Sequence, residues 1–272
     1  MNYTETVFCI NEKMNIIEVK NLTKKYAHLT AVNSVNFNVQ DGEMFAFLGP
    51  NGAGKTTTIK ILTTLLSPTS GTATINGFDV CQQTDEVRGS FGIVFQDPSL
   101  DDKLTAEENL RFQGWLYNIP AKELKERIPM LLEMFELKDR AKDLVEQFSG
   151  GMKRRLEVAR GLLHKPKILF LDEPTIGLDP QTRNKIWEYL RGLKQKEHLT
   201  IFYTTHYMDE AEFADKVIII DHGKIIANGT PAELKTQTNQ TTLNDVFLFL
   251  TGKDIREVNI STPEKMKGSF GH

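Results

Sequence analysis

A glycine-rich stretch from Gly49 to Thr56, with the letters GPNGAGKT, constrains this chain more than any other feature. An apolar run at 43–48 precedes it and is typical of a buried strand, and residues 57–62 follow with the apolar spacing of a helix. A strand, a glycine-rich turn and a helix form the context in which the pattern GxxxxGK[ST] binds phosphate. Glycines let backbone N–H groups converge on one anion, and the positive end of the helix points to the same place. The sequence therefore predicts a nucleotide-binding loop.

Two side chains at the end of this loop have chemistry of their own. Lys55 is expected to contact the β- and γ-phosphates, and the Thr56 hydroxyl is expected to ligate Mg²⁺. An ordinary glycine-rich turn is the alternative, and the flanking strand and helix argue against it. The residues of the loop expected to hold the nucleotide are Gly49, Pro50, Asn51, Gly52, Ala53, Gly54, Lys55, Thr56 and Thr57.

Composition excludes several classes of protein. Lys and Arg number 33 against 36 Asp and Glu, so the charge balance does not indicate a nucleic-acid partner. No apolar run approaches the ~20 residues that a membrane helix needs, and the start of the chain lacks the pattern of a secretion signal. Cys9 and Cys81 match no metal-binding spacing, which favours a reducing compartment. We therefore expect a protein that is soluble when considered alone.

Hydrophobic patterning along the chain predicts an α/β fold. Strands alternate with helical stretches after residue 167, the pattern of a parallel sheet, whereas 31–39 has one polar face and suits an antiparallel strand. Strands are expected at 16–22, 31–39, 43–48, 72–77, 91–95, 167–171, 200–205, 216–221 and 224–229, and helices at about 55–66, 106–117, 121–137, 149–163 and from 180. Pro129 is expected to punctuate the helical stretch at 121–137.

The absence of strand patterns between 97 and about 164 indicates a helical subdomain inserted in the α/β domain. We divide the chain into a leader at 1–14, a nucleotide-binding domain at 15–240 that contains this subdomain, and a tail at 241–272.

Two adjacent carboxylates follow the buried strand at 167–171. Ligands of open α/β sheets bind at the carboxyl ends of the strands. Asp172 is therefore expected to hold Mg²⁺ through water, and Glu173 to orient and deprotonate an attacking water. Such a pair also serves as a simple cap of the following loop, but a phosphate loop in the same chain favours the catalytic interpretation.

The segment Ser149-Gly150-Gly151 opens a stretch with helical spacing that runs to about residue 163. A hydroxyl, bare N–H groups and the helix dipole would together make a second anion site there. Lys153, Arg154 and Arg155 follow in the first turn, where cations are unfavourable for a helix unless an anion lies nearby. A plain glycine-rich helix cap is the alternative interpretation.

These features occur in the order seen in ATP-binding cassette (ABC) ATPases, and the chain resembles that family over about residues 15–235. The family's motifs match Gly49–Thr56, Gln96, Phe148–Met152, Leu171–Pro174, Gly177–Asp179 and Thr204–His206. The segments 148–157 and 242–247 resemble the daunorubicin-resistance-like group of exporter ATPases. The resemblance implies a P-loop NTPase core with an antiparallel β side sheet and an inserted helical subdomain.

The resemblance implies roles for residues that would attract little attention alone. His206 would contact the γ-phosphate and the catalytic water, Gln96 would contact Mg²⁺ and the same water, and Tyr26 would stack on adenine. A lone histidine or tyrosine is more often structural, so these assignments depend on the motif positions. The remaining histidines, His28, His164, His198, His222 and His272, are expected at the surface.

The resemblance also implies a second ATPase subunit. Ser149, Gly150 and Gly151 would contact the γ-phosphate held by that subunit, and the loop that ends at Asp179 would communicate across the dimer. Met152 replaces the family's usual glutamine and cannot donate an amide hydrogen bond.

The function implied is that of an ATP-hydrolysing, Mg²⁺-dependent subunit of an ABC transporter, an exporter, on the cytoplasmic face of the membrane. ATP-driven formation of a homodimer or heterodimer would power a separate membrane permease. The permease is expected to dock on residues 96–120, where acidic residues mix with large apolar ones. The alternative is a soluble ABC ATPase that acts on a cytosolic assembly, such as one in iron–sulfur cluster biogenesis.

Overall fold

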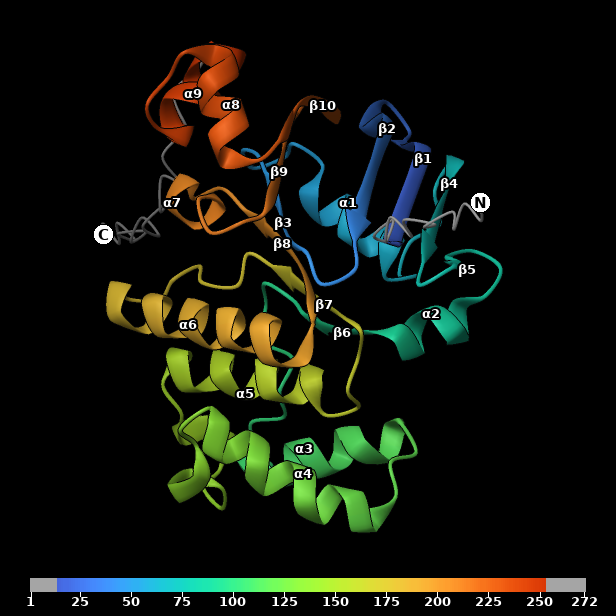
Figure 1. Cartoon of the computed structure of the whole chain (residues 1–272). Helices are drawn as coiled ribbons and strands as arrows, with labels where there is room; N and C mark the ends of the chain where they lie inside the picture. The colour runs from blue at the N-terminus through green and yellow to red at the C-terminus, as the bar shows by residue number, and fades with distance from the viewer. Residues whose placement is uncertain (1–13, 253–272) are drawn as a thin grey trace, which may run out of the picture.

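The computed structural model describes residues 14–252 and contains two β-sheets, of which the larger forms the centre of the molecule (Figure 1). The larger sheet has six strands in the order β10-β9-β3-β8-β7-β6. These are β3 (Met44–Leu48), β6 (Phe91–Val94), β7 (Ile168–Asp172), β8 (Thr200–Thr205), β9 (Lys216–Asp221) and β10 (Lys224–Gly229). All neighbours pair in parallel except β10, which is antiparallel to β9. The predicted parallel sheet is confirmed.

The smaller sheet is antiparallel and has the order β2-β1-β4-β5. Its strands are β1 (Asn15–Tyr26), β2 (Leu29–Gln40), β4 (Ser70–Ile75) and β5 (Phe78–Asp79). In β2 the side chains of Val35 and Phe37 are buried, whereas those of Ser34 and Asn36 are exposed. The side sheet and the one polar face of this strand are therefore as predicted.

Strand β3 is buried on both faces, and its side chains divide between two cores. Phe45 and Phe47 belong to the core shared with the small sheet and with helix α1 (Lys55–Leu62), where the Phe45 ring lies 5.2 Å from that of Phe202. Met44, Ala46 and Leu48 belong to the core on the opposite, helical side. Because successive side chains of a strand point to opposite faces, one short strand anchors both layers.

A helical subdomain lies between β6 and β7 and forms the lower part of Figure 1. Its elements are α3 (Ala106–Leu116), α4 (Ala121–Met134), the 3₁₀ turns Lys138–Arg140 and Val145–Gln147, and α5 (Gly150–Leu162). Within this described segment, strand pairing is limited to one bridge between Thr105 and Leu144. The expectation that Pro129 interrupts a helix is wrong, because α4 continues through it. A proline costs a helix ~3 kcal/mol or more, and the burial of Leu124, Ile128, Leu131 and Leu132 offsets that cost.

The remaining helices are α2 (Thr84–Ser90), α6 (Pro180–Glu197), α7 (Met208–Ala211), α8 (Pro231–Thr238) and α9 (Leu243–Thr251). Helix α1 ends at Leu62 rather than near 66, because Thr64 adopts a left-handed backbone with φ of 62°. In α9, Val246 and Phe247 are buried in the same core as the helical subdomain. Among residues 14–252, no helix combines the length and apolar character needed to cross a membrane.

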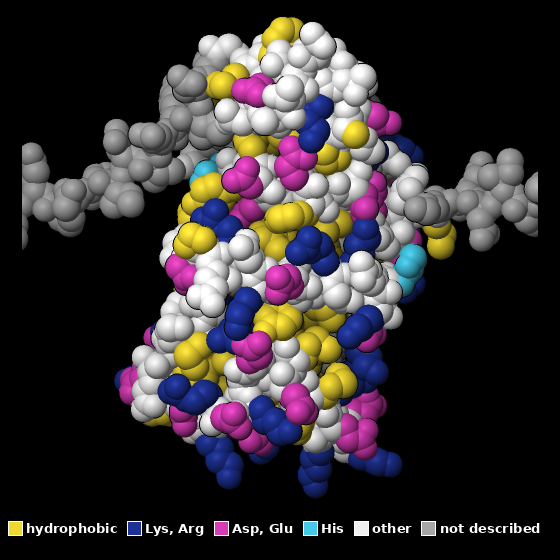
Figure 2. Space-filling model, turned by 60° about the vertical axis from the view of Figure 1, so that its left-hand side comes forward, with side chains coloured by type: hydrophobic (Ala, Val, Ile, Leu, Met, Phe, Trp, Pro, Cys, Tyr) yellow, Lys and Arg dark blue, Asp and Glu magenta, His cyan; other side chains and the backbone are white. Residues whose placement is uncertain are grey.

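The surface carries charges of both signs. On the face shown in Figure 2, Lys and Arg side chains alternate with Asp and Glu, and hydrophobic side chains show between them in the middle and lower parts. The lower part of this face belongs to the helical subdomain (Figure 1 and Figure 2). In that subdomain, Trp115 and Leu116 are each 62% exposed and Phe112 is 51% exposed. Large apolar side chains left in solvent often mark an interaction surface.

The close approach of β6 to α5 predicts a specific loss of stability. A Cβ atom at Gly92 would lie 2.0 Å from the carbonyl oxygen of Gly161 in α5. We expect Gly92→Ala to lower the free energy of unfolding by ~1–3 kcal/mol, since overpacking of a core has this cost. Gly89→Ala is the matched control: a Cβ there meets no atom within 4 Å, and alanine favours the helix. Urea unfolding of both variants compares them, and equal stabilities would contradict the packing argument.

Candidate functional site

The glycine-rich loop joins β3 to α1, and its backbone conformation explains its glycines. Gly54 has φ of 109° and forms the N-cap of α1. A Cβ atom at Gly54 would lie 2.4 Å from the carbonyl oxygen of Ala31, and one at Gly49 would lie 2.4 Å from that of Ile220. These approaches bring neighbouring backbone against the loop on two sides. The predicted strand, turn and helix around the loop are confirmed.

Lys55 is buried and connects the loop to the acidic pair. Its ammonium donates to the carbonyl oxygens of Gly49 at 2.8 Å and Pro50 at 3.2 Å. It also lies 3.0 Å from Oε1 of Glu173. Because a buried ammonium is costly without partners, these contacts hold the charge at the base of the loop.

Asp172 and Thr56 meet at the carboxyl end of β7. Oδ1 of Asp172 accepts hydrogen bonds from the hydroxyls of Thr204 at 2.5 Å and Thr56 at 3.3 Å. A carboxylate beside a hydroxyl fits Mg²⁺, which prefers oxygen ligands and takes one or two from a protein while keeping waters and substrate phosphates. Within residues 14–252, no group of three or more His, Cys, Asp or Glu is placed to hold a metal unaided.

Glu173 lies between two basic groups. Oε2 is 2.9 Å from Nδ1 of His206, and Oε1 faces Lys55. Burial raises the pKa of the Glu173 carboxyl, but the His206 hydrogen bond and the Lys55 charge more than reverse this and hold the pKa at about 2. The backbone of Glu173 has φ of 48°, a conformation rare outside glycine, and its N–H donates to the carbonyl oxygen and hydroxyl of Thr204. The carboxylate is thus ionised and fixed in place.

A further buried carboxylate, missed by the sequence reasoning, supports this arrangement. Glu210 in α7 accepts hydrogen bonds from the hydroxyls of Thr205, at 2.6 Å, and Thr175. Thr205 precedes His206, and Thr175 lies two residues after Glu173. Glu210 therefore links the backbone segments that carry the two catalytic candidates. No helical spacing points to Glu210 in the sequence, because α7 begins only at Met208 and the carboxylate reaches back to Thr205, outside the helix.

The segment Ser149-Gly150-Gly151 caps α5 and lies away from the phosphate loop. The hydroxyl of Ser149 accepts the N–H of Met152 at 3.3 Å, as an N-cap does. A Cβ atom at Gly151 would lie 2.6 Å from Cγ2 of Thr182, in α6. In the part of the chain that the structure describes, no hydrogen bond or ion pair joins this segment to the phosphate loop.

Asp179 caps the neighbouring helix α6. Its carboxylate accepts the N–H of Thr182 at 3.0 Å, and the hydrogen bonds from Thr182 lower the pKa of the Asp179 carboxyl. The structure therefore brings Asp179 and the Ser149 segment together through Thr182, and keeps both apart from Lys55.

The cations near the start of α5 have carboxylate partners within the chain. Lys153 lies 2.7 Å from Asp102, Arg154 lies 3.2 Å from Glu157, and Arg155 lies 3.1 Å from Glu136. These pairs offset the unfavourable position of the cations near the positive end of the helix.

Gln96 and Tyr26 lie at the edges of the site. Gln96 follows β6 and is exposed, and its backbone carbonyl oxygen accepts from Arg154 at 3.4 Å. Tyr26 ends β1 with 43% of its surface exposed, and the Lys24 ammonium lies 5.3 Å from its ring centroid. An exposed ring at this position is available for stacking.

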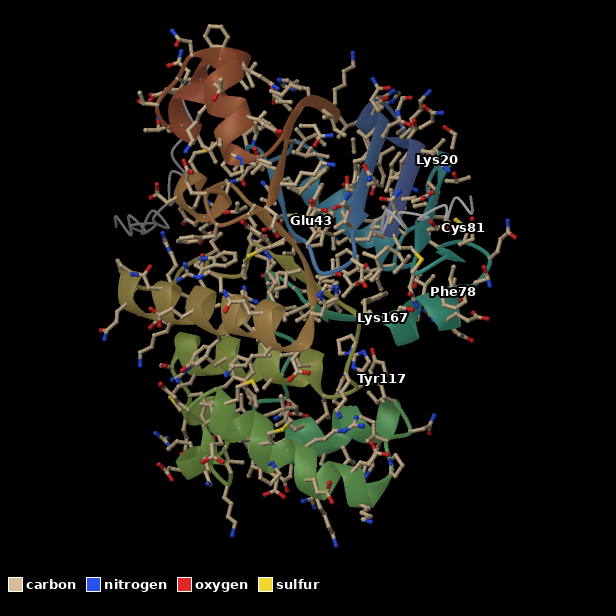
Figure 3. The ribbon with its side chains drawn as sticks, viewed as in Figure 1. Lys20, Glu43, Phe78, Cys81, Tyr117 and Lys167 are labelled. Atoms are coloured by element: carbon tan, nitrogen blue, oxygen red, sulfur yellow. The ribbon has the colours of Figure 1, made fainter. Side chains whose placement is uncertain are left out.

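The expectation that His164 lies on the surface is wrong. The His164 ring is half-buried and stacks 4.0 Å from that of Tyr117, which Figure 3 labels at the boundary of the helical subdomain. Nε2 lies 2.9 Å from the carbonyl oxygen of Phe91, and burial lowers the pKa of the imidazole. His28, His198 and His222 are exposed as expected, and His272 lies outside the described residues.

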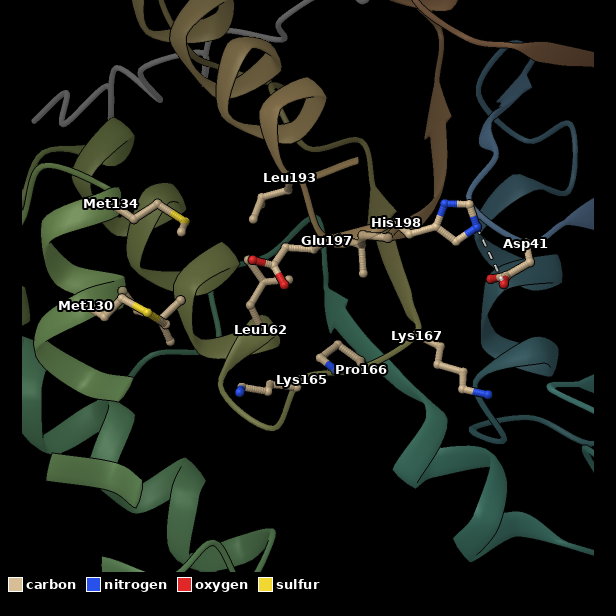
Figure 4. Close-up of a pocket in the computed structure, with 12 residues that line it drawn as sticks. Asp41, Met130, Met134, Leu162, Lys165, Pro166, Lys167, Leu193, Glu197 and His198 are labelled. Atoms are coloured by element: carbon tan, nitrogen blue, oxygen red, sulfur yellow. Dashed lines mark ion pairs between the residues drawn. The ribbon is translucent and has the colours of Figure 1, made fainter. Parts of the chain in front are cut away.

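A cavity of about 440 Å³ opens at the opposite end of the parallel strands (Figure 4). Met130 and Met134 of α4 line one side, and His198 and Asp41, 3.7 Å apart, line the other. Lys167 and Leu199, which also line it, precede β7 and β8. The cavity is therefore separate from the phosphate loop, which follows the carboxyl end of β3.

The geometry defines a P-loop nucleoside-triphosphatase with a helical insertion, and comparisons with known proteins identify its family. Residues 32–176 match the ABC transporter family. The linearmycin resistance ATP-binding protein LnrL of Bacillus subtilis is 42% identical over 89% of this chain and 76% of its own length. The daunorubicin/doxorubicin resistance ATP-binding protein DrrA of Streptomyces peucetius is 43% identical over 84% of this chain and 69% of its own length. YbhF of Escherichia coli, a probable multidrug ABC transporter ATP-binding protein, is 44% identical, and the matched region spans 38% of its length.

Solved structures support the same family assignment. The ATP-binding subunit of an ABC transporter superposes with a TM-score of 0.79 at 33% identity, over 87% of this chain and 99% of its own. A dimeric cassette, MJ0796, bound to ADP and Pi in a post-hydrolysis state gives a TM-score of 0.71 at 31% identity, over 79% of this chain and 98% of its own. The chain belongs to the ABC transporter family and is an ATP-binding, ATP-hydrolysing protein.

The lowered pKa of Glu173 predicts a pH-dependent contribution to stability. An unfolded glutamate protonates near 4.5, whereas the folded one stays ionised down to about 2. The contribution is therefore complete above about pH 4.5 and is lost as the pH falls towards about 2. The difference in unfolding free energy between the parent and Glu173→Gln should shrink between about pH 7 and about pH 3.5 in urea titrations. A difference independent of pH would contradict the assignment.

Proposed function

We propose that this chain is the ATPase subunit of an exporter, in which two cassettes close on ATP and drive a separate membrane permease. The observation that carries the proposal is the buried cluster in which Lys55 and His206 hold an ionised Glu173 beside the phosphate loop. The names of LnrL and DrrA, which are resistance proteins, support export. No observation favours work on a cytosolic assembly. The location that follows is peripheral, on the cytoplasmic face of the membrane.

ATP hydrolysis in this site starts with a change of partner for Lys55. When the phosphates enter the loop, the ammonium turns from Glu173 to the β- and γ-oxygens, a stronger and more charged set of acceptors. Glu173 is then free to accept a proton from the attacking water, and His206 orients that water and the γ-phosphate. Gln96, at the rim, contacts the same water. The products are ADP and phosphate, and Glu173 returns the proton to solvent.

Thr56 and Asp172 are the residues that would hold Mg²⁺, directly and through water, with Gln96 beside them. When bound, Mg²⁺ would neutralise charge on the β- and γ-phosphates. The contact between Thr56 and Asp172 prepares both oxygens for that role. Tyr26 would receive the adenine ring on its exposed face.

Dimerisation would bring Ser149, Gly150 and Gly151 of one subunit onto the γ-phosphate bound by the other. Ser149 and Gly150 are exposed at the N-terminus of α5 and Gly151 is half-buried, so the N–H groups at this end of the helix can face an anion. Asp179 would lie at the same seam, since it meets that segment through Thr182. The dimeric state of MJ0796 with ADP and Pi supports dimerisation.

A groove on the helical subdomain suits the permease. It has a volume of about 260 Å³ and is lined by Ser99, Asp101, Leu104, Asn109, Phe112, Gln113, Leu116 and Arg160. Its apolar side chains Phe112 and Leu116 are exposed and polar side chains lie beside them, a mixture that accepts an amphipathic segment of a partner. The first residue that lines the groove, Ser99, is three residues after Gln96. A displacement of the groove by the permease would therefore be transmitted directly to the nucleotide site.

Substitutions at Glu173 and Lys55 separate catalysis from binding. Glu173→Gln should lower the ATPase rate ~10²–10⁴-fold, because the general base is lost, while ATP is still bound and closed dimers accumulate. Lys55→Ala should instead weaken ATP binding. Steady-state phosphate release, titration with a fluorescent ATP analogue and size-exclusion chromatography measure the three effects. A Glu173→Gln enzyme that turns over at the parent rate would refute the assigned base.

The docking groove is tested by a matched pair of exposed residues in α3. Phe112→Ser with Leu116→Ser should leave the ATPase active and reduce co-purification with the permease, since both side chains line the groove and are half or more exposed. Trp115→Ser is the control, because Trp115 is as exposed as Leu116 but lines a different pocket, which Lys125 also lines. Pull-down from membranes compares them. Undiminished recovery of the first variant, or equal losses from both, would place the docking surface elsewhere.

A further inference from the structure

Arg154, whose position near the start of α5 the sequence could not explain, is buried against the nucleotide site. Its side chain is 5% exposed. One guanidinium nitrogen donates to the carbonyl oxygen of Phe95 at 2.5 Å, and the other donates to those of Gln96 at 3.4 Å and Glu173 at 3.3 Å. One planar group thus joins α5 to the segment after β6 and to the backbone of the proposed base.

Glu157 completes this contact from the same helix. It is 1% exposed, lies 3.2 Å from Arg154, and accepts the N–H of Ser99 at 2.8 Å. Burial disfavours both charges, raising the pKa of Glu157 and lowering that of Arg154. A buried ion pair seldom adds net stability compared with apolar residues of the same volume. The Arg154–Glu157 pair also holds three backbone carbonyls through Arg154. This indicates that the pair positions the backbone rather than adding to stability.

We propose that Arg154 is a positioning residue that couples the two nucleotide sites of an ABC dimer through helix α5. The N-terminus of α5 carries Ser149, which under the proposed function faces the ATP of the other subunit. Arg154 follows five residues later, a rise of ~7.5 Å along a rigid helix, and touches Gln96 and Glu173 of its own site. Occupation of one site therefore moves the backbone of the base in the other.

The coupling rests on the proposed dimer, and the experiment separates the two ideas. Arg154→Met with Glu157→Gln removes both charges and keeps an oxygen for the Ser99 N–H, so no buried charge is left unpaired. We expect the ATPase Hill coefficient to fall from a cooperative parent value to about 1 and kcat to fall ~5- to 150-fold, the range that coupling between two sites has for binding. Affinity of the monomer for a fluorescent ATP analogue should stay within about twofold, because the hydrogen bonds of Arg154 go to backbone carbonyls and Glu157 and not to the phosphate loop.

Arg155→Met with Glu136→Gln is the matched control. Arg155 is the next residue of α5 and likewise binds a carbonyl oxygen, that of Phe135, and a glutamate, but it contacts neither Gln96 nor Glu173. This variant should keep the parent Hill coefficient and kcat. Arg154→Lys retains the charge beside Glu157 but offers a single nitrogen for three carbonyls, so it should recover thermal stability and not the Hill coefficient.

The outcomes are distinct. A parent that neither hydrolyses ATP nor dimerises would overturn the proposed function. A parent that does both without cooperativity would overturn only the coupling. Coupling is likewise refuted if the Arg154 variant keeps the parent Hill coefficient, or if the control loses cooperativity to the same extent, which would indicate a general weakening of α5.

Discussion

The buried contact between Lys55 and Glu173 is the interaction on which the rest of the site depends. Burial of either charge alone would be costly, but the Lys55 ammonium lies 3.0 Å from one carboxylate oxygen of Glu173, and His206 lies beside the other oxygen. The three side chains come from segments that follow β3, β7 and β8. The sheet order places β3, β8 and β7 side by side, so these residues meet without any long loop. The two cores on either face of β3 then keep that meeting point fixed.

The parts of the fold that follow from local patterns were predictable from the sequence. The period-two alternation in β2 and the apolar runs of β3, β7 and β8 indicate strands, because burial on one or both faces leaves that signature. The phosphate loop could be placed because Gly49 and Gly54 are required by the close approach of Ile220 and Ala31. Lys55, Asp172, Glu173 and His206 were predicted as site residues, and they do meet in space; their chemical roles stay proposals.

What the sequence could not give depends on contacts between distant segments. Pro129 is tolerated because tertiary burial of α4 outweighs its local preference. Arg154 and Glu210 look like surface charges in a linear reading, and only the packing of α5 and α7 against the strand ends reveals their buried partners. His164 is similar, since its stacking partner Tyr117 lies just after α3, in a different part of the chain. Short helices such as α2 and α8 are too short for a clear hydrophobic period in the sequence. Thr230 and Glu233 nevertheless form a capping box that marks the start of α8.

The strand order also has a consequence for how the protein is made. β3 lies near the start of the chain, but it pairs with β8 and β9, with Phe45 opposite both Phe202 and Lys216. Contacts of such long range are slow to form, because a large loop must close before they contribute. During synthesis the ribosome therefore releases the phosphate loop long before its neighbouring strands exist. Nascent chains truncated before β8 should have no assembled ATP site, because Thr204 and His206 are missing, and this places the gain of nucleotide binding late in translation.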